Sequence, residues 1–129
     1  MSTKTNFILV RHGETEWNLS GRWQGHADAP LSERGEAQAK ALGERFKGES
    51  FDACCVSDLG RAVRTAELVG QPSGLAFVPD ERLRERDLGV MQGLTTGEML
   101  ERCPEVYDSF RNAGPDYLVP EGESFRQFH

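Results

Sequence analysis

An uninterrupted apolar run at positions 7–10, Phe-Ile-Leu-Val, is the feature that most constrains the fold of this chain. Such a run predicts a strand buried on both faces, as in a parallel sheet that helices cover on each side. Arg11 and His12 follow at once, and open parallel sheets bind their ligands beyond the carboxyl ends of their strands. The sequence therefore places its first candidate site directly after this strand.

Strands and helices alternate along the rest of the chain. Strands are expected at 51–56 and 75–78, and helices at 32–46, 58–69 and 99–103. Ser32 is the expected N-cap of the first helix, and either Ser57 or Asp58 that of the second. This order predicts an α/β fold of three layers, with helices on both faces of a mostly parallel sheet. The length of 129 residues allows one domain, spanning 1–129.

Composition argues against several classes of partner. A net charge of −6 disfavours a nucleic-acid backbone or an anionic membrane surface. No stretch approaches the roughly 20 apolar residues that span a bilayer, and positions 1–6 lack the apolar core of a secretory signal. The three cysteines, with Cys54 and Cys55 adjacent, fit neither a disulfide framework nor a zinc site, so we expect reduced packing residues. These features predict a cytoplasmic protein.

His12 is the candidate nucleophile. Its neutral imidazole is abundant near pH 7, and attack by one ring nitrogen requires a neighbour that orients the other. Gly13 would let the backbone come close and offer its amide for that purpose or to a phosphate oxygen. The tripeptide Arg-His-Gly alone fits a core histidine equally well.

Two arginines and one glutamate extend this chemistry. Phosphoryl transfer needs fixed cations, and a guanidinium can hold two oxygens at once. Arg11 adjoins His12, and Arg61 is expected in the first turn of the helix at 58–69, where free amides also favour an anion. Glu85 could protonate a leaving alkoxide. Taken alone, Arg61 also fits a solvated surface residue, and Glu85 a carboxylate among salt-bridging neighbours.

Five segments together resemble the histidine phosphatase superfamily, in its phosphoglycerate mutase-like form. They are RHGETEWN at 11–18, QGHADAPLSERG at 24–35, SDLGRAVRTA at 57–66, LRERDLGVMQG at 83–93 and PEGES at 120–124. The resemblance implies that Arg11, His12, Arg61 and Glu85 are catalytic and that His12 becomes phosphohistidine. It also implies that Asn18, Gln24 and Gly25 bind the phosphate or the rest of a small phosphorylated metabolite, with no metal or other cofactor.

The sequence departs from the family pattern near its end. The family has a second active-site histidine on a later strand, beside the strand that leads to the first, and neither His26 nor His129 matches its motif. The spacing of Ser124 and Gln127 fits a capping box, which predicts that a further helix begins there. We therefore expect a domain that is incomplete at its C-terminus, with two strands facing a gap. It is either a fragment of a longer protein or a chain whose gap a second copy fills by swapping or dimerising.

Three functions remain open on the sequence. The segment 93–120 contains only Arg102 and Arg111 and lacks the paired arginines of the mutase substrate lid, which favours water as the phosphoryl acceptor. The favoured function is a phosphatase that hydrolyses a small phosphomonoester. The alternatives are a phosphoglycerate mutase and a catalytically impaired module that binds phosphate.

Overall fold

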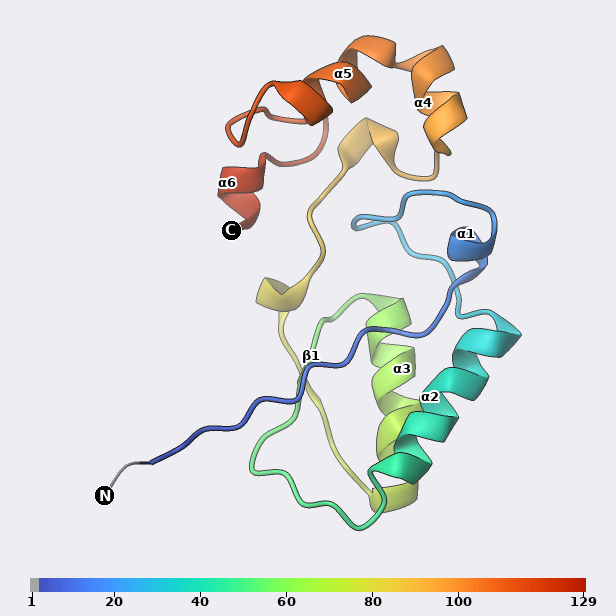
Figure 1. Ribbon diagram of the computed structural model, residues 1–129, viewed down its shortest axis with the longest axis vertical. Helices are drawn as coiled ribbons and strands as arrows, with labels where there is room; N and C mark the ends of the chain where they lie inside the picture. The colour runs from blue at the N-terminus through green and yellow to red at the C-terminus, as the bar shows by residue number, and fades with distance from the viewer. Residues whose placement is uncertain (1–2) are drawn as a thin grey trace.

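The computed structural model describes residues 3–129, so positions 1 and 2 of the polar N-terminal stretch lie outside the described residues. The α-helices are α1 (Glu16–Leu19), α2 (Glu33–Arg45), α3 (Gly60–Gly70), α4 (Thr96–Arg102), α5 (Pro104–Asn112) and α6 (Phe125–Phe128). The strands are β1 (Cys55–Val56) and β2 (Val78–Pro79), and 3-10 turns lie at Gln71–Ser73, Glu81–Leu83 and Gly89–Met91. Figure 1 shows α2 and α3 packed together at one end of the molecule, with α4, α5 and α6 at the other.

The helix pair α2 and α3 carries the first apolar core. Its buried side chains are Leu31, Ala39, Leu68 and Val69. Gly43 lets the helices approach closely, since a Cβ there would lie 2.9 Å from the carbonyl oxygen of Leu68. Ser32 is the N-cap of α2, as predicted, and its side chain accepts a hydrogen bond from the backbone N–H of Gly35. The site described below lies at the N-terminal end of α3.

The sheet is smaller than the sequence predicts. β1 and β2 pair in parallel, with Cys55 opposite Val78, which confirms the parallel arrangement but only over two residues of each strand. The run at 7–10 is extended, yet among residues 3–129 it has no strand partner, and Leu9 is 92% exposed. The prediction of a doubly buried strand is therefore wrong for this chain. A strand is buried on both faces only when neighbouring strands and helices supply the contacts, and the described residues do not supply them.

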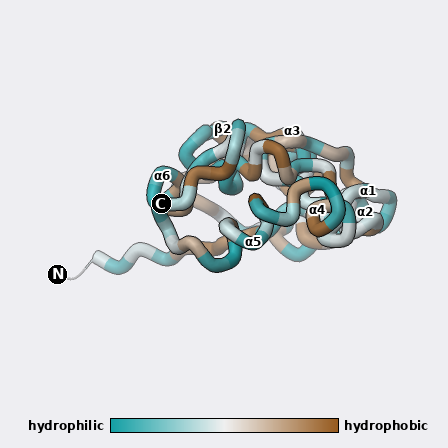
Figure 2. The backbone as a smooth tube through the Cα atoms, turned by 90° about the horizontal axis from the view of Figure 1, so that it is seen from above, coloured by the Kyte–Doolittle hydropathy of each residue, from teal (hydrophilic) through white to brown (hydrophobic). Residues whose placement is uncertain are grey.

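The N-terminal segment projects from the body of the molecule in both views (Figure 1 and Figure 2). The exposed apolar side chains Phe7, Ile8 and Leu9 lie on this segment, and Val78 of β2 is exposed as well. Only part of the predicted three-layer architecture is thus present: two parallel strands with helices.

The second apolar core lies under α4 and α5. Leu88, Met91, Met99 and Val119 are its buried members. The helix expected at 99–103 is α4, which begins earlier, at Thr96, because Thr95 and Glu98 form a capping box. It ends before Pro104 as predicted, but Pro104 itself begins a further helix, α5, that the sequence does not predict.

The capping box of the last helix forms as predicted, whereas the three cysteines differ in burial. Ser124 and Gln127 form the predicted capping box at the start of α6. Cys103 packs against the second core and Cys54 is half-buried, whereas Cys55 is exposed, so the packing interpretation is wrong for that residue. Within residues 3–129 the helices are too short or too polar to cross a membrane.

Candidate active site

The ring of His12 is held by its own turn. Its Nδ1 lies 2.7 Å from the carbonyl oxygen of Gly13. Because a carbonyl oxygen can only accept, Nδ1 carries the proton, and the lone pair of the neutral ring is therefore on Nε2. Nε2 is therefore the ring nitrogen of this half-buried imidazole that can act as a nucleophile.

The surroundings of His12 keep it neutral. Burial is the largest cause that lowers the pKa of His12, and the positive charges of Arg61 and Arg11 lower it further. The hydrogen bond to Gly13 and the charge of Asp28 act in the opposite direction without reversing the shift. The unprotonated imidazole, which is the form that can attack, is therefore the main species at pH 7.

A buried threonine ties the His12 turn to α3. The backbone N–H of Gly13 donates to Thr65 Oγ1 at 3.0 Å, and that hydroxyl donates to the carbonyl oxygen of Arg61 at 2.7 Å. The expectation that the Gly13 amide orients His12 or binds phosphate is thus wrong, because Thr65 occupies the amide and the Gly13 carbonyl orients the ring. Gly13 leaves no room for a side chain, since a Cβ would lie 2.5 Å from the carbonyl oxygen of Gly35.

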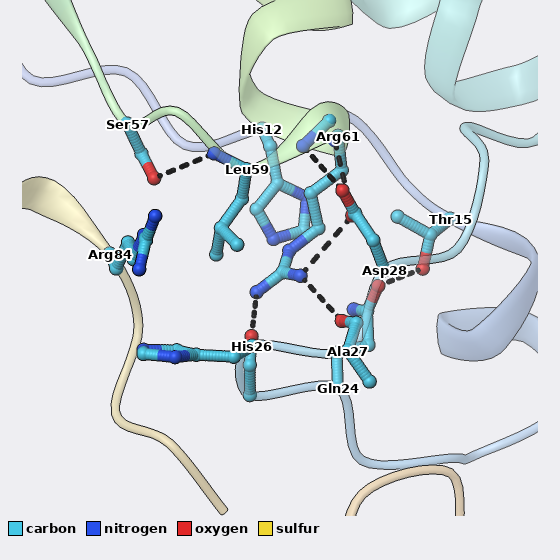
Figure 3. Close-up of polar contacts among 12 residues, drawn as sticks. His12, Thr15, Gln24, His26, Ala27, Asp28, Ser57, Leu59, Arg61 and Arg84 are labelled. Atoms are coloured by element: carbon cyan, nitrogen blue, oxygen red, sulfur yellow. Dashed lines mark hydrogen bonds and ion pairs between the residues drawn. The ribbon is translucent and has the colours of Figure 1, made fainter. Parts of the chain in front are cut away.

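Arg61 is a buried cation beside His12 (Figure 3). It lies in the first turn of α3, as predicted, but only 4% of the residue is exposed, so it is not a solvated surface residue. Its guanidinium donates to the carbonyl oxygens of Ala27 at 3.0 Å and Gly25 at 2.8 Å, and to Asp28 at 3.4 Å. Among the described residues, the Nε–H and one Nη2–H have no acceptor, which leaves donors for an anion.

The N-terminus of α3 is capped from a distant loop. The Asp28 carboxylate accepts from the backbone N–H groups of Gly60 and Arg61, the latter at 3.2 Å. The prediction that Ser57 or Asp58 caps this helix is therefore wrong: Leu59 stands at the cap position with no side-chain bond of its own. The first-turn amides expected to attract an anion are already occupied, so an anion here depends on the guanidinium of Arg61.

Arg11 and Glu85 are less tightly placed. Arg11 is exposed and close enough to His12 for its charge to lower the pKa of the imidazole. Glu85 is exposed, and its carboxylate accepts from the backbone N–H of Arg86 at 2.9 Å. The flanking arginines bind elsewhere, Arg84 to Asp58 at 2.7 Å and Arg86 to a backbone carbonyl. Glu85 is thus an exposed carboxylate that its arginine neighbours leave available.

The chain is similar to known proteins in sequence and in fold. Residues 7–129 match the model of the histidine phosphatase superfamily, branch 1. This chain belongs to that superfamily. A protein of Cronobacter sakazakii named probable phosphoglycerate mutase GpmB is 40% identical over 119 residues, which cover 92% of this chain and 55% of that protein. The chain thus spans about half the length of the curated relatives it matches.

Two solved phosphatase structures are similar to this chain in fold. The alpha-ribazole phosphatase from Shigella flexneri is 33% identical with a TM-score of 0.84, covering 92% of this chain and 59% of that one. A mycobacterial glucosyl-3-phosphoglycerate phosphatase, solved as a complex with VO3, is 36% identical with a TM-score of 0.76, covering 91% and 58%. The partial architecture described above is therefore part of a phosphoglycerate mutase-like fold.

The three residues expected to bind phosphate, Asn18, Gln24 and Gly25, differ in how close they lie to Arg61. The side-chain oxygen of Gln24, which is buried, accepts from Thr15 at 2.9 Å, and Gly25 holds Arg61 through its carbonyl. Asn18 is exposed and completes the capping box of α1 with Thr15. His26 points its Nδ1 at Asp87, 3.3 Å away. Gly25 thus binds Arg61 directly, while Gln24, Asn18 and His26 lie in other contacts.

Asp28 and Thr65 are site residues that the sequence does not single out. Asp28 is 33 positions from Arg61 and Thr65 is 52 positions from Gly13, so no local spacing reports either contact. Both lie inside segments that resemble the family, at 24–35 and 57–66, and that was the only available signal.

Proposed function

We propose that this histidine phosphatase transfers the phosphoryl group of a small phosphomonoester to His12 and then to water. The observation that carries the proposal is the pairing of a pinned, neutral imidazole with a buried guanidinium that still has free N–H donors. His12 Nε2 attacks phosphorus, an N–P bond forms, and the P–O ester bond breaks with its electron pair on the leaving oxygen. Water then attacks phosphorus, the N–P bond breaks, and inorganic phosphate leaves.

Arg61 and Arg11 stabilise the charge of the transferred group in this proposal. The loose transition state spreads negative charge over three equatorial oxygens, so fixed cations contribute more than covalent help. Arg61 suits this role because its hydrogen bonds to Gly25 and Ala27 hold the guanidinium in one place before substrate arrives. Arg11 is exposed and its charge acts on His12, so it supplies a second cation at the same place.

Glu85 donates the proton that the leaving oxygen requires. A carboxyl group beside the leaving oxygen acts there as a general acid. Its freedom from the flanking arginines favours this role. Asn18, Gln24 and Gly25 complete the proposed phosphate and substrate contacts, Gln24 and Gly25 from the loop that surrounds Arg61.

Water is the proposed acceptor because the segment from 93 to 120 is poor in cations. Between positions 93 and 120 the arginines are Arg102 and Arg111, and Arg111 donates to the hydroxyl of Tyr107. Both the alpha-ribazole phosphatase and the mycobacterial phosphatase are similar to this chain, which supports hydrolysis of a small phosphorylated metabolite. A phosphoglycerate mutase is the second candidate, favoured by the similarity to the Cronobacter protein.

The whole protein is proposed to complete the three-layer α/β/α fold. The exposed apolar run at 7–10 needs a pairing strand, and the 119 matched residues make up only 55% of the Cronobacter relative. A strand that leads to a second active-site histidine would fill this gap and add a phosphate ligand.

Turnover of a generic aryl phosphate by the purified full-length protein tests the proposal. We expect hydrolysis that His12→Ala abolishes and that Asp80→Asn retains. Asp80 is a matched control because it also caps a helical turn and pairs with an arginine, but the pair is with the exposed Arg82. Phosphate binding without turnover would instead identify a phosphate-binding module.

A further inference from the structure

We infer that Asp28 is a positioning residue that fixes the direction of the Arg61 guanidinium toward the group that His12 attacks. The inference rests on the proposed function and adds to it a residue that does not itself touch the substrate. Figure 3 shows the Asp28 carboxylate between the start of α3 and the side chain of Arg61, with His12 beside them.

Asp28 holds Arg61 at both of its ends. One carboxylate oxygen, Oδ1, accepts from the backbone N–H of Arg61 at 3.2 Å and from its Nη1 at 3.4 Å. The other, Oδ2, accepts from the backbone N–H of Gly60. A long side chain whose backbone and guanidinium are bound to the same carboxylate cannot choose freely among its rotamers.

Two backbone carbonyl groups of the same loop also accept hydrogen bonds from the guanidinium. Gly25 and Ala27 accept from Nη2 and Nη1, so three acceptors within residues 25–28 bind the two terminal nitrogens of the guanidinium. These contacts leave the Nε–H and one Nη2–H for an anion. The loop therefore decides which donors of Arg61 remain available, and Asp28 is its only charged member in contact with the guanidinium among residues 3–129.

An amide cannot replace this carboxylate. Donors approach both oxygens of Asp28, whereas asparagine offers one acceptor oxygen and an NH2 group that would face an N–H. The charge also matters, because the Arg61 side chain is only 3% exposed and a buried cation needs a counter-ion. Asp28→Asn keeps the volume of the side chain and removes the charge and one acceptor.

The same substitution changes the electrostatics at His12. The charged groups that act on the imidazole are Arg61 from α3, Arg11 from the preceding segment and Asp28 from the loop. Of these three charges, only that of Asp28 favours the protonated ring, so its loss lowers the pKa of His12 further. The acid limb of kcat/KM, which reports the free enzyme, then moves to lower pH. A residue that merely supported the fold would not move that limb.

Steady-state kinetics of the full-length protein with an aryl phosphate, from pH 4 to pH 9, test the inference. For Asp28→Asn we expect at least a tenfold lower kcat/KM and an acid limb at lower pH, while Asp80→Asn changes neither. A wild-type kcat/KM and an unmoved limb in Asp28→Asn would overturn the inference.

A second variant keeps the test decisive if Asp28→Asn does not fold. Asp28→Glu retains the charge and displaces the oxygens, so we expect a lower kcat/KM with the acid limb in its wild-type position. Wild-type kcat/KM in a folded Asp28→Glu protein would overturn the inference. Turnover by the wild type, lost in His12→Ala, is measured alongside: its absence overturns the proposed function and this inference together, whereas its presence with an unchanged Asp28 variant overturns this inference alone.

Discussion

Replacing Thr65 by valine removes one buried hydroxyl and almost nothing else. The two side chains have nearly the same shape, but valine can neither accept from the backbone N–H of Gly13 nor donate to the carbonyl oxygen of Arg61. The Arg61 carbonyl lies in α3 and keeps the helical bond from the backbone of residue 65. The Gly13 amide, by contrast, loses the one acceptor that the described residues give it.

The loss of stability comes from the Gly13 N–H, which is left without an acceptor. A buried N–H without a partner costs roughly 1–3 kcal/mol, so the free energy of unfolding of Thr65→Val should fall by about that amount. Thr65→Ser keeps the hydroxyl and loses one methyl group, which costs about 0.8 kcal/mol or less. Because the Gly13 carbonyl holds the ring of His12, a shifted turn should also lower kcat in the valine variant and spare it in the serine variant.

Urea unfolding of the purified full-length protein measures the first effect, and hydrolysis of an aryl phosphate the second. A change in the midpoint at constant slope reports stability alone. The reasoning would be refuted if Thr65→Val unfolded within about 0.5 kcal/mol of the wild type, the usual range of a neutral substitution. Equal losses in the valine and serine variants would refute the assignment to the hydroxyl.

The remaining predictions concern packing and pH. Gly35→Ala should destabilise the protein by roughly 1–3 kcal/mol, because its Cβ would lie 2.0 Å from the carbonyl oxygen of Glu14. Gly97→Ala is the matched control, since its nearest neighbour is 3.9 Å away and alanine favours a helix, so urea midpoints should fall for the first and not the second. The acid limb of kcat/KM should have its midpoint below 6.5, because burial lowers the pKa of His12 from that value. The unfolded chain then binds a proton that the folded one excludes, so stability should fall as pH drops through 6.5, and this pH-dependent loss should be smaller in His12→Gln.

Local signals in the sequence predicted local structure well. Ser32 and the Ser124–Gln127 capping box lie within a turn of the groups they bind, and both were confirmed. The cap of α3 was missed because Asp28 reaches it from 32 positions away, and nearby Ser57 and Asp58 were the only visible candidates. Long-range contacts of this kind depend on how loops pack, and neither periodicity nor propensity reports them.

In the candidate site, too, the local features could be predicted from the sequence and the long-range contacts could not. The sequence placed Arg61 in the first turn of α3, which is confirmed, and His12 directly after a buried strand, which the described residues do not form. It could not give the burial of Arg61, nor the exchange of roles between the Gly13 amide and carbonyl. The apolar run at 7–10 is exposed and not buried as predicted. Hydropathy indicates that a strand favours burial, but it does not show which residues would cover the strand.

Phosphorylation of His12 is the central claim, and brief exposure of the full-length protein to an aryl phosphate followed by rapid quenching tests it most directly. Mass spectrometry of the quenched protein should find one phosphoryl group on His12 that is stable in base and lost in acid. An enzyme that turns over substrate while residue 12 stays unmodified at every quench time would contradict the account.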